Sequence, residues 1–324
     1  MKKAFSLIEL SIVILIIGIL IAGITQSSRL IHSMHVATAQ NITSGSPVAS
    51  IKGIMFWYET SLDSSFVSGE NTDNAVITQW KDNNPQTTYK HNAFAGQRTN
   101  SSSISYNVAP SATSGNTSGP TYIENGINDL PTLRFTNNNA LAYRYLVVDG
   151  NVKNIGNEGI TAFAVVSYRS GTGWILDRVC VNGSLAPTLC GSSTNGGRPL
   201  FGGWMLSGEL RFDRRDDNNN TPPSTWNAST GYTMAASQKY ILTFERKYGT
   251  SFNVYVNGTV VKSEVDAIGP INMNTTKIGR HTENDNDNID IDISEVIFFS
   301  GRVKTDDRKL IEAYLGEKYG VKIN

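Results

Sequence analysis

The first residue whose chemistry stands out is Glu9, a carboxylic acid inside an apolar run. Among residues 5–24, a stretch of 20, Glu9 is the only charged side chain. A helix rises about 1.5 Å per residue, so this run would measure about 30 Å, the thickness of a bilayer core. A carboxylate at mid-bilayer costs roughly 2.5 kcal/mol or more and usually marks a function. The run therefore predicts a membrane-spanning helix in which Glu9 has a specific task.

Cys180 and Cys190 are the only two cysteines of the chain. A lone close pair in an exported chain can form one local disulfide where the compartment is oxidising. Two unrelated free thiols are the alternative. A metal site is not indicated, because the spacing does not match zinc ligation and no histidine or second cysteine pair lies nearby.

An acidic loop at residues 283–290 offers Asp285 and Asp287 as calcium ligands. Carboxylate oxygens are the hard ligands that calcium prefers. The loop lacks the glycine and the bidentate glutamate of an EF-hand, and a solvated Asn/Asp turn between strands is the alternative. Calcium is therefore a candidate ligand, and no cofactor is required by the sequence.

A third group of acids is Asp290, Asp292 and Glu295. This segment loosely resembles the catalytic strand of jelly-roll glucanases, in which two acids about 5 Å apart cleave a glycosidic bond with retention. Asp290 stands where that pattern has a glutamate, and its shorter side chain would not obviously keep the separation. Alternation places Asp290 and Asp292 outward and their isoleucine neighbours inward. We expect no enzymatic activity and keep a membrane-tethered glycosidase as an alternative.

Three interpretations compete for the N-terminal apolar run. Lys2 and Lys3 precede it and favour a cytoplasmic N-terminus, with everything after Arg29 on the outer side. A secretory signal would be cleaved after the run, but residues 24–28 contain no A-x-A pattern. A plain uncleaved membrane anchor would give no function to the Glu9 carboxylate.

Residues 3–10, KAFSLIEL, resemble the class III leader of type IV pilins and pseudopilins. The resemblance implies that a prepilin peptidase cuts between Ala4 and Phe5 and that Phe5 is then N-methylated. Glu9 becomes the fifth mature residue, and its carboxylate can neutralise the new amine of a neighbouring subunit. Ala4 replaces the usual glycine, and Gln26 stands where pilin helices often carry proline. The missing proline is common in pseudopilins and minor subunits.

The chain is expected to divide into a leader at residues 1–4, a transmembrane and assembly helix at 5–40, a linker at 41–53 and a head at 54–324. Apolar periodicity fades after Leu30, and the sequence SGSP at residues 44–47 breaks a helix. We therefore expect a short helix with the head beginning almost at once.

The head is predicted to consist of strands and turns followed by one helix. Asn257-Gly258 between two β-branched and aromatic runs is the strongest hairpin signal in the chain. The terminal helix has Thr305 as its N-cap and Gly320 at its end. Its predicted apolar stripe consists of Leu310, Ile311, Tyr314 and Leu315.

Segments of the head, in their order, resemble laminin G-like, concanavalin A-like jelly rolls. They include WKDN at residues 80–83, residues 120–135, residues 163–166 and residues 295–299. The resemblance implies a mostly β fold: an N-terminal transmembrane helix, then a concanavalin A-like β-sandwich with a C-terminal helix. It also implies lectin-like binding of a glycan or a surface protein. Any of the five tryptophans could stack on a sugar, although core packing is the expectation for most of them.

The charges balance, with 28 Lys plus Arg and 28 Asp plus Glu, so no nucleic-acid partner is expected. The sequence therefore predicts a pilin-like subunit of a type IV pilus or related filament with an adhesive head. Its partners would be the prepilin peptidase and other pilin or pseudopilin subunits. It would reside in the bacterial inner membrane by a single pass, with a periplasmic C-terminus, and then in the filament. A pseudopilin of a type II-like secretion system is the alternative.

Overall fold

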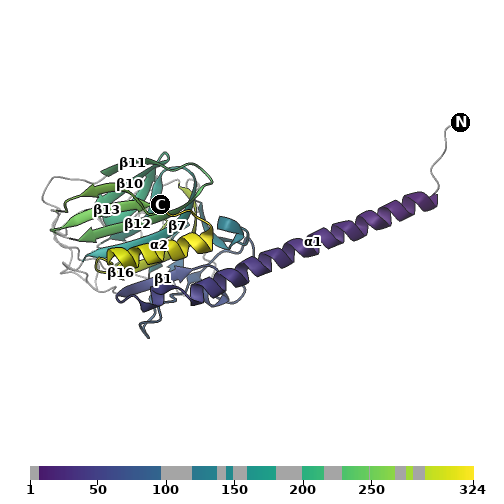
Figure 1. Cartoon of the computed structure of the whole chain (residues 1–324), viewed down its shortest axis with the longest axis horizontal. Helices are drawn as coiled ribbons and strands as arrows, with labels where there is room; N and C mark the ends of the chain where they lie inside the picture. Colours follow the sequence, from purple (N-terminus) through teal and green to yellow (C-terminus); the bar gives the residue numbers. More distant parts are fainter. Residues whose placement is uncertain are drawn as a thin grey trace, which may run out of the picture.

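The computed structural model describes residues 7–95, 119–136, 144–148, 159–179, 199–214, 228–247, 249–266, 275–279 and 289–324. Within these residues a long N-terminal helix leads into a sandwich of two antiparallel sheets, and the chain closes with a second helix (Figure 1). The predicted fold class, mostly β with a helix at each end, is confirmed.

The helices are α1 (Leu7–Ser44) and α2 (Thr305–Tyr319), with short 3-10 turns at Pro47–Ser50, Asp63–Ser65 and Ile127–Asp129. The first strands are β1 (Ile54–Glu59), β2 (Gln79–Trp80), β3 (Ala93–Ala95), β4 (Thr121–Ile123), β5 (Thr132–Thr136), β6 (Leu146–Val148), β7 (Ile160–Ser170) and β8 (Gly173–Val179). The later strands are β9 (Pro199–Leu206), β10 (Glu209–Arg214), β11 (Ala228–Thr233), β12 (Lys239–Lys247), β13 (Ser251–Val256), β14 (Thr259–Glu264), β15 (Thr275–Ile278) and β16 (Asp290–Ser300).

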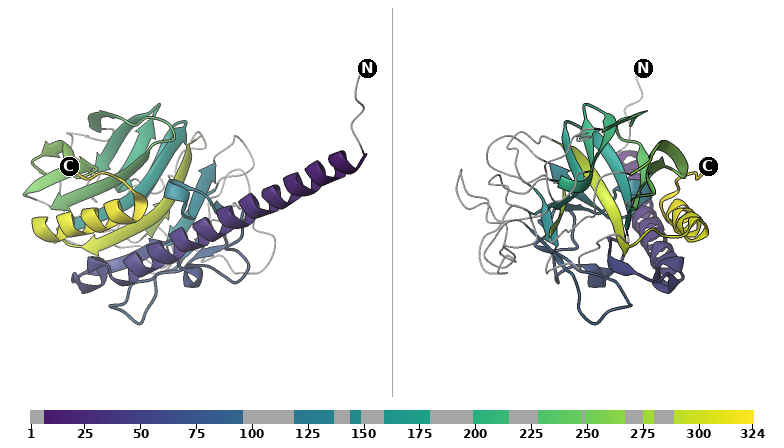
Figure 2. Two further views of the ribbon diagram at one scale, coloured as in Figure 1. Left: turned by 45° about the vertical axis from the view of Figure 1, so that its right-hand side comes forward. Right: turned by 90° about the vertical axis from the view of Figure 1, so that its left-hand side faces the viewer.

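The two sheets form the layers of the head. Sheet A has the order β14-β13-β12-β7-β16-β5-β4, with β1 also paired to β16, and sheet B has the order β11-β10-β9-β8-β15-β6-β3-β2. Helix α2 and the C-terminal part of α1 cover the outer face of sheet A (Figure 2). The head therefore has three described layers: helices, sheet A and sheet B.

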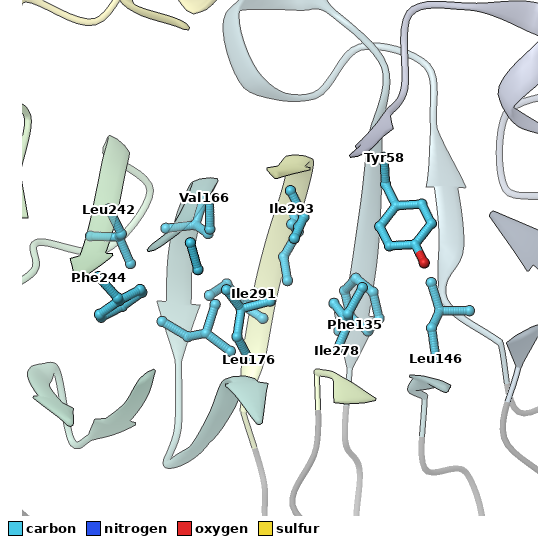
Figure 3. Packing of buried hydrophobic residues seen from close by; sticks show 14 of the residues in the cluster. Tyr58, Phe135, Leu146, Val166, Leu176, Leu242, Phe244, Ile278, Ile291 and Ile293 are labelled. Carbon is cyan, nitrogen blue, oxygen red and sulfur yellow. The ribbon is translucent and has the colours of Figure 1, made fainter. Parts of the chain in front are cut away.

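Each boundary between layers has its own apolar core. Between the sheets lie side chains such as Phe135, Leu176, Phe244 and Ile291 (Figure 3). A second cluster fills the space between sheet A and the helices, and it includes Ala39 of α1 and Ile311 and Leu315 of α2. The outer face of sheet A is thus a buried surface, as helix packing requires.

A bulge in β16 decides which of its side chains face the helices. Ile291 and Ile293 point into the core between the sheets, and the register with β7 then shifts between Ile293 and Glu295. One extra residue in a strand exchanges the two faces of everything beyond it. Val296 therefore faces sheet B, whereas Glu295 faces the helices.

Helix α1 is longer than the fading apolar pattern predicts. α1 runs without interruption for 38 residues to Ser44, and the break comes at Gly45. Tertiary packing explains the greater length. Ala39 and Thr43 are buried against the head, and this packing stabilises a helix whose own sequence is not strongly amphipathic.

Two predicted details of the terminal helix are wrong. Thr305 is the first helical residue, and the cap position belongs to Lys304, which makes no side-chain capping bond. Leu310 is 54% exposed, since the buried face of α2 also includes the charged Arg308 and Lys318, which an apolar pattern omits. Gly320 ends the helix with φ of 58°, as predicted.

Replacing Gly279 with alanine is expected to destabilise the head by about 3 kcal/mol. Its φ of +84° disfavours any side chain, and an added Cβ would lie 2.3 Å from Phe135 Cδ1 in the core. Denaturant unfolding of the full chain in detergent measures the loss. Gly249→Ala is the matched control, because Gly249 has φ of +69° and no atom within 4 Å of the added Cβ. Equal losses for the two variants would contradict the predicted overlap with Phe135.

Candidate functional site

The N-terminal part of α1 is an exposed apolar surface. Leu7 is 86% exposed and Ile24 is 69% exposed, and the described apolar side chains between them are exposed as well. The helix projects away from the head (Figure 1). It is long and apolar enough to cross a membrane, and a signal sequence passes the same test.

The C-terminal part of α1 is fixed to the head along one face. His32 Nε2 lies 3.5 Å from Glu124 Oε1, and Gln40 Nε2 donates to the Ser61 carbonyl at 2.9 Å. Thr43 is buried, with its hydroxyl 3.5 Å from the Tyr314 hydroxyl of α2. Residues 32–43 thus belong to the head, whereas the residues before them extend from it.

The predicted leader residues are only partly within the described chain. Ala4 and Phe5 lie outside the described residues. Glu9 lies in the first turns of α1, and its side chain is not described. α1 continues through Gln26, the position where a proline is often found in pilins. The disulfide and calcium predictions fall outside the described residues, at Cys180, Cys190, Asp285 and Asp287.

Asp290 and Asp292 point outward from sheet A, as predicted, while the isoleucines beside them are fully buried. Arg134 donates from Nε and Nη2 to the two oxygens of Asp292, at 2.8 and 2.9 Å. Arg169 Nε donates to Asp290 at 3.1 Å. Both carboxylates are therefore held in ion pairs across neighbouring strands.

Glu295 is fully buried under α2 and separated from bulk water. Its Oε1 accepts hydrogen bonds from Trp57 Nε1 and the Tyr314 hydroxyl, both at 2.8 Å. Its Oε2 accepts from Lys318 Nζ at 2.9 Å and the Tyr319 hydroxyl at 3.0 Å. These four donors occupy the carboxylate completely.

Lys318 also contacts a second buried carboxylate, Glu59, at the end of β1. Lys318 Nζ lies 2.8 Å from Glu59 Oε2, and both side chains have no exposed surface. Glu59 further accepts from the backbone amide of Ser61 at 2.9 Å, that of Leu62 at 2.7 Å, and the Ser65 hydroxyl at 3.1 Å. Lys318, Glu59 and Glu295, which we call the buried triad, join the first strand, the central strand and the last helix of the head.

Opposing effects set the charge of the buried triad. Burial alone would raise the pKa of Glu59, but the Lys318 ammonium and the donors from Ser61 outweigh it and leave that pKa lowered. Burial alone would lower the pKa of Lys318, but Glu295 and Glu59 raise it above its ordinary value. Lys318 and Glu59 therefore form an ion pair at neutral pH.

Sequence reasoning named Glu295 but missed Glu59 and Lys318. Glu59 ends an apolar strand in which every residue is buried, and Lys318 follows Tyr314 by four positions on the buried face of α2. The sequence did contain a signal for both residues: each is a charged side chain at a position where the pattern of its strand or helix is otherwise buried.

The four tryptophans within the described residues divide into two groups, and Trp226 lies outside those residues. Trp57 and Trp80 are buried and donate their indole N–H groups to Glu295 and to the Glu59 carbonyl, so they pack in the core as expected. Trp174 and Trp204 stack on the outer face of sheet B with centroids 5.8 Å apart. The Arg211 guanidinium lies 5.7 Å from the Trp204 ring, and Glu209 holds it at 2.8 Å. We call Trp174, Trp204 and Arg211 the aromatic row.

No family model and no curated protein matches the chain. Among solved structures, it resembles the binding domain of Paraclostridial Mosquitocidal Protein 1, with 13% identity, a TM-score of 0.50, and coverage of 81% of this chain and 52% of that one. It also resembles the ligand-binding domain of botulinum neurotoxin serotype D in complex with N-acetylneuraminic acid, with 12% identity, a TM-score of 0.50, and coverage of 84% and 53%. This chain thus matches about half the length of each. The head therefore has the β-sandwich fold of lectin-like binding domains.

Proposed function

We propose that the chain is a pilin-like subunit of a type IV pilus or related filament, with a head that binds a glycan or a surface protein. The observation that carries the proposal is the division of α1. Its apolar first part is exposed on all sides, whereas residues 32–43 are locked to the head. Large exposed apolar surfaces mark membrane or protein interfaces, and this one is rigidly attached to a globular domain.

The leader resemblance favours assembly over simple anchoring. Cleavage before Phe5 would create an amine within reach of the Glu9 of a neighbouring subunit, which gives the intramembrane carboxylate a partner. The subunit would reside in the bacterial inner membrane with its head in the periplasm, and would leave the membrane when it enters the filament.

The head is proposed to bind rather than to cleave. Asp290 and Asp292 are held by arginines, and Glu295 is buried, so none of the three is placed as a free acid or base. Within the aromatic row Trp174 is buried, so the partly exposed Trp204 is the residue proposed to contact a sugar. The botulinum domain of the same fold is solved with a sialic acid, which supports a glycan as the first ligand to test.

Leader processing tests the assembly proposal. The full chain is produced in bacteria with and without a prepilin peptidase, and its N-terminal peptide is analysed by mass spectrometry. With the peptidase, the mature chain is expected to begin at Phe5 and to carry one added methyl group on its amine. In the same cells, Glu9→Gln should be processed normally but enter sheared filaments about 100-fold less, because an unpaired buried charge costs about 3 kcal/mol.

Glu317→Gln, an exposed position on α2, is the matched control for Glu9→Gln and should assemble like the wild type. If the chain kept Met1 in the presence of an active peptidase, the assembly proposal would be contradicted, and α1 would be an ordinary membrane anchor.

Trp204→Ala is expected to weaken glycan binding by roughly fivefold, since an aromatic stacking contact contributes about 1 kcal/mol. The full chain in detergent is applied to an array of sialylated and neutral glycans. Tyr89→Ala, an exposed aromatic residue elsewhere on the head, serves as the control. Unchanged binding by Trp204→Ala would exclude the aromatic row as the binding surface.

A further inference from the structure

The buried triad has the arrangement needed to form a covalent bond. Lys318 Nζ lies between two carboxylates, 2.8 Å from Glu59 Oε2 and 2.9 Å from Glu295 Oε2. None of the three side chains has exposed surface. A lysine amine is a nucleophile, a carboxyl carbon is an electrophile, and a second carboxylate can carry protons between them.

We propose that Lys318 and Glu59 condense to an intramolecular amide, with Glu295 as the proton carrier. Lys318 gives one ammonium proton to Glu295, and the neutral amine attacks Cδ of Glu59. The Nζ–Cδ bond forms as the Cδ–Oε2 bond breaks. The departing oxygen leaves as water with two protons from Lys318, one returned by Glu295 and one lost from the attacking nitrogen. An ammonium and a carboxylate thus become an amide and water, and no other reactant is needed.

The surroundings of Glu59 suit the attacked carboxyl group. Its Oε1 accepts from the Leu62 amide at 2.7 Å and from the Ser65 hydroxyl at 3.1 Å. These donors stabilise the negative charge that develops on this oxygen as the amine adds to the carbon. The folded chain holds the amine against the carboxyl, which gives a high effective concentration and excludes the water that would favour hydrolysis.

The product keeps the two hydrogen bonds to Glu59 Oε1, whereas the Ser61 amide loses its acceptor when Oε2 leaves. Amide formation removes two buried charges, whose desolvation is costly even when they are paired. Glu295 keeps its hydrogen bonds from Trp57, Tyr314 and Tyr319. Three of its four donors are thus independent of the Lys318 ammonium.

The bond would join the two ends of the head. Glu59 ends β1, the first strand after α1, and Lys318 lies in the last turn of α2. Pulling on α1 loads β1 from Ile54 toward Glu59. With the link, a load that reaches Glu59 passes through Lys318 and α2 into β16, a central strand of sheet A. The amide is independent of the proposed role in a filament and would form in any folded copy of the chain.

Mass spectrometry of the full wild-type chain, reduced and denatured, tests the proposal directly. The tryptic digest is expected to contain one branched peptide that joins residues 53–81 to residues 310–322, lighter than the sum of the two by one water. Trypsin should no longer cleave after Lys318. Separate peptides at their unmodified masses, or a loss of water located at other residues, would overturn the amide.

Glu295→Gln tests the proton carrier. It keeps the shape of the side chain, and we expect the linked fraction at a fixed time after synthesis to fall at least tenfold. Glu312→Gln, which alters another buried glutamate on α2, should stay linked. Equal linkage in the Glu295→Gln variant and the wild type would overturn the role of Glu295 while leaving the bond itself established by the branched peptide.

Discussion

Replacing Lys318 with methionine is expected to destabilise the head by about 3–5 kcal/mol. Methionine fills a similar volume but can neither pair with Glu59 and Glu295 nor form the proposed amide, so both carboxylates stay buried without a positive charge between them. An uncompensated buried charge is among the most costly changes that a single substitution can make. Thermal and denaturant unfolding of the full chain in detergent, followed by circular dichroism, measures the loss.

Two further variants separate the charge effect from damage to α2. Lys309→Met changes an exposed lysine of the same helix and should alter stability by at most about 0.5 kcal/mol. Combining Lys318→Met with Glu59→Gln and Glu295→Gln removes all three charges and should recover part of the loss, because the remaining groups are neutral. If Lys318→Met unfolded at the same midpoint as Lys309→Met, the buried triad would have no stabilising role.

Turn residues and the alternation of apolar residues predicted much of the fold, because the structure that they favour does not depend on residues far away in the sequence. Asn257 and Gly258 both have positive φ, 50° and 81°, as the two central residues of a tight hairpin require. The alternation around Ile291 and Ile293 placed Asp290 and Asp292 on the outer face because side chains alternate strictly in an unbroken strand.

The buried triad could not be predicted in this way. Glu59 and Lys318 are 259 positions apart, and no local period connects them. The bulge at Ser294 that turns Glu295 toward α2 has no marker such as glycine or proline. The apolar pattern of α2 includes the exposed Leu310 and omits the buried Lys318 for the same reason, because the acidic partners of Lys318 lie far away in the sequence.

A chain that begins at Gly53 is expected to be less stable than one that begins at Arg29 by about 3–5 kcal/mol. The shorter chain lacks Ala39, Thr43 and Val48, all buried against the head, and a fully buried aliphatic side chain contributes about 1.5–3 kcal/mol. It also loses the hydrogen bond from Gln40 to the Ser61 carbonyl. Both chains omit most of the exposed apolar run, so urea unfolding in plain buffer compares them.

Equal urea midpoints for the two chains would show that the sandwich is complete without α1. The expected difference would show that residues 32–43 of α1 are part of the head and not a linker. Force applied to α1 would then be transmitted to the head through these residues. Ala39 packs in the same cluster as Leu315 of α2, and Thr43 contacts Tyr314, which donates to Glu295 of β16. A pull on the exposed part of α1 would therefore reach a central strand of sheet A through side-chain contacts as well as through β1.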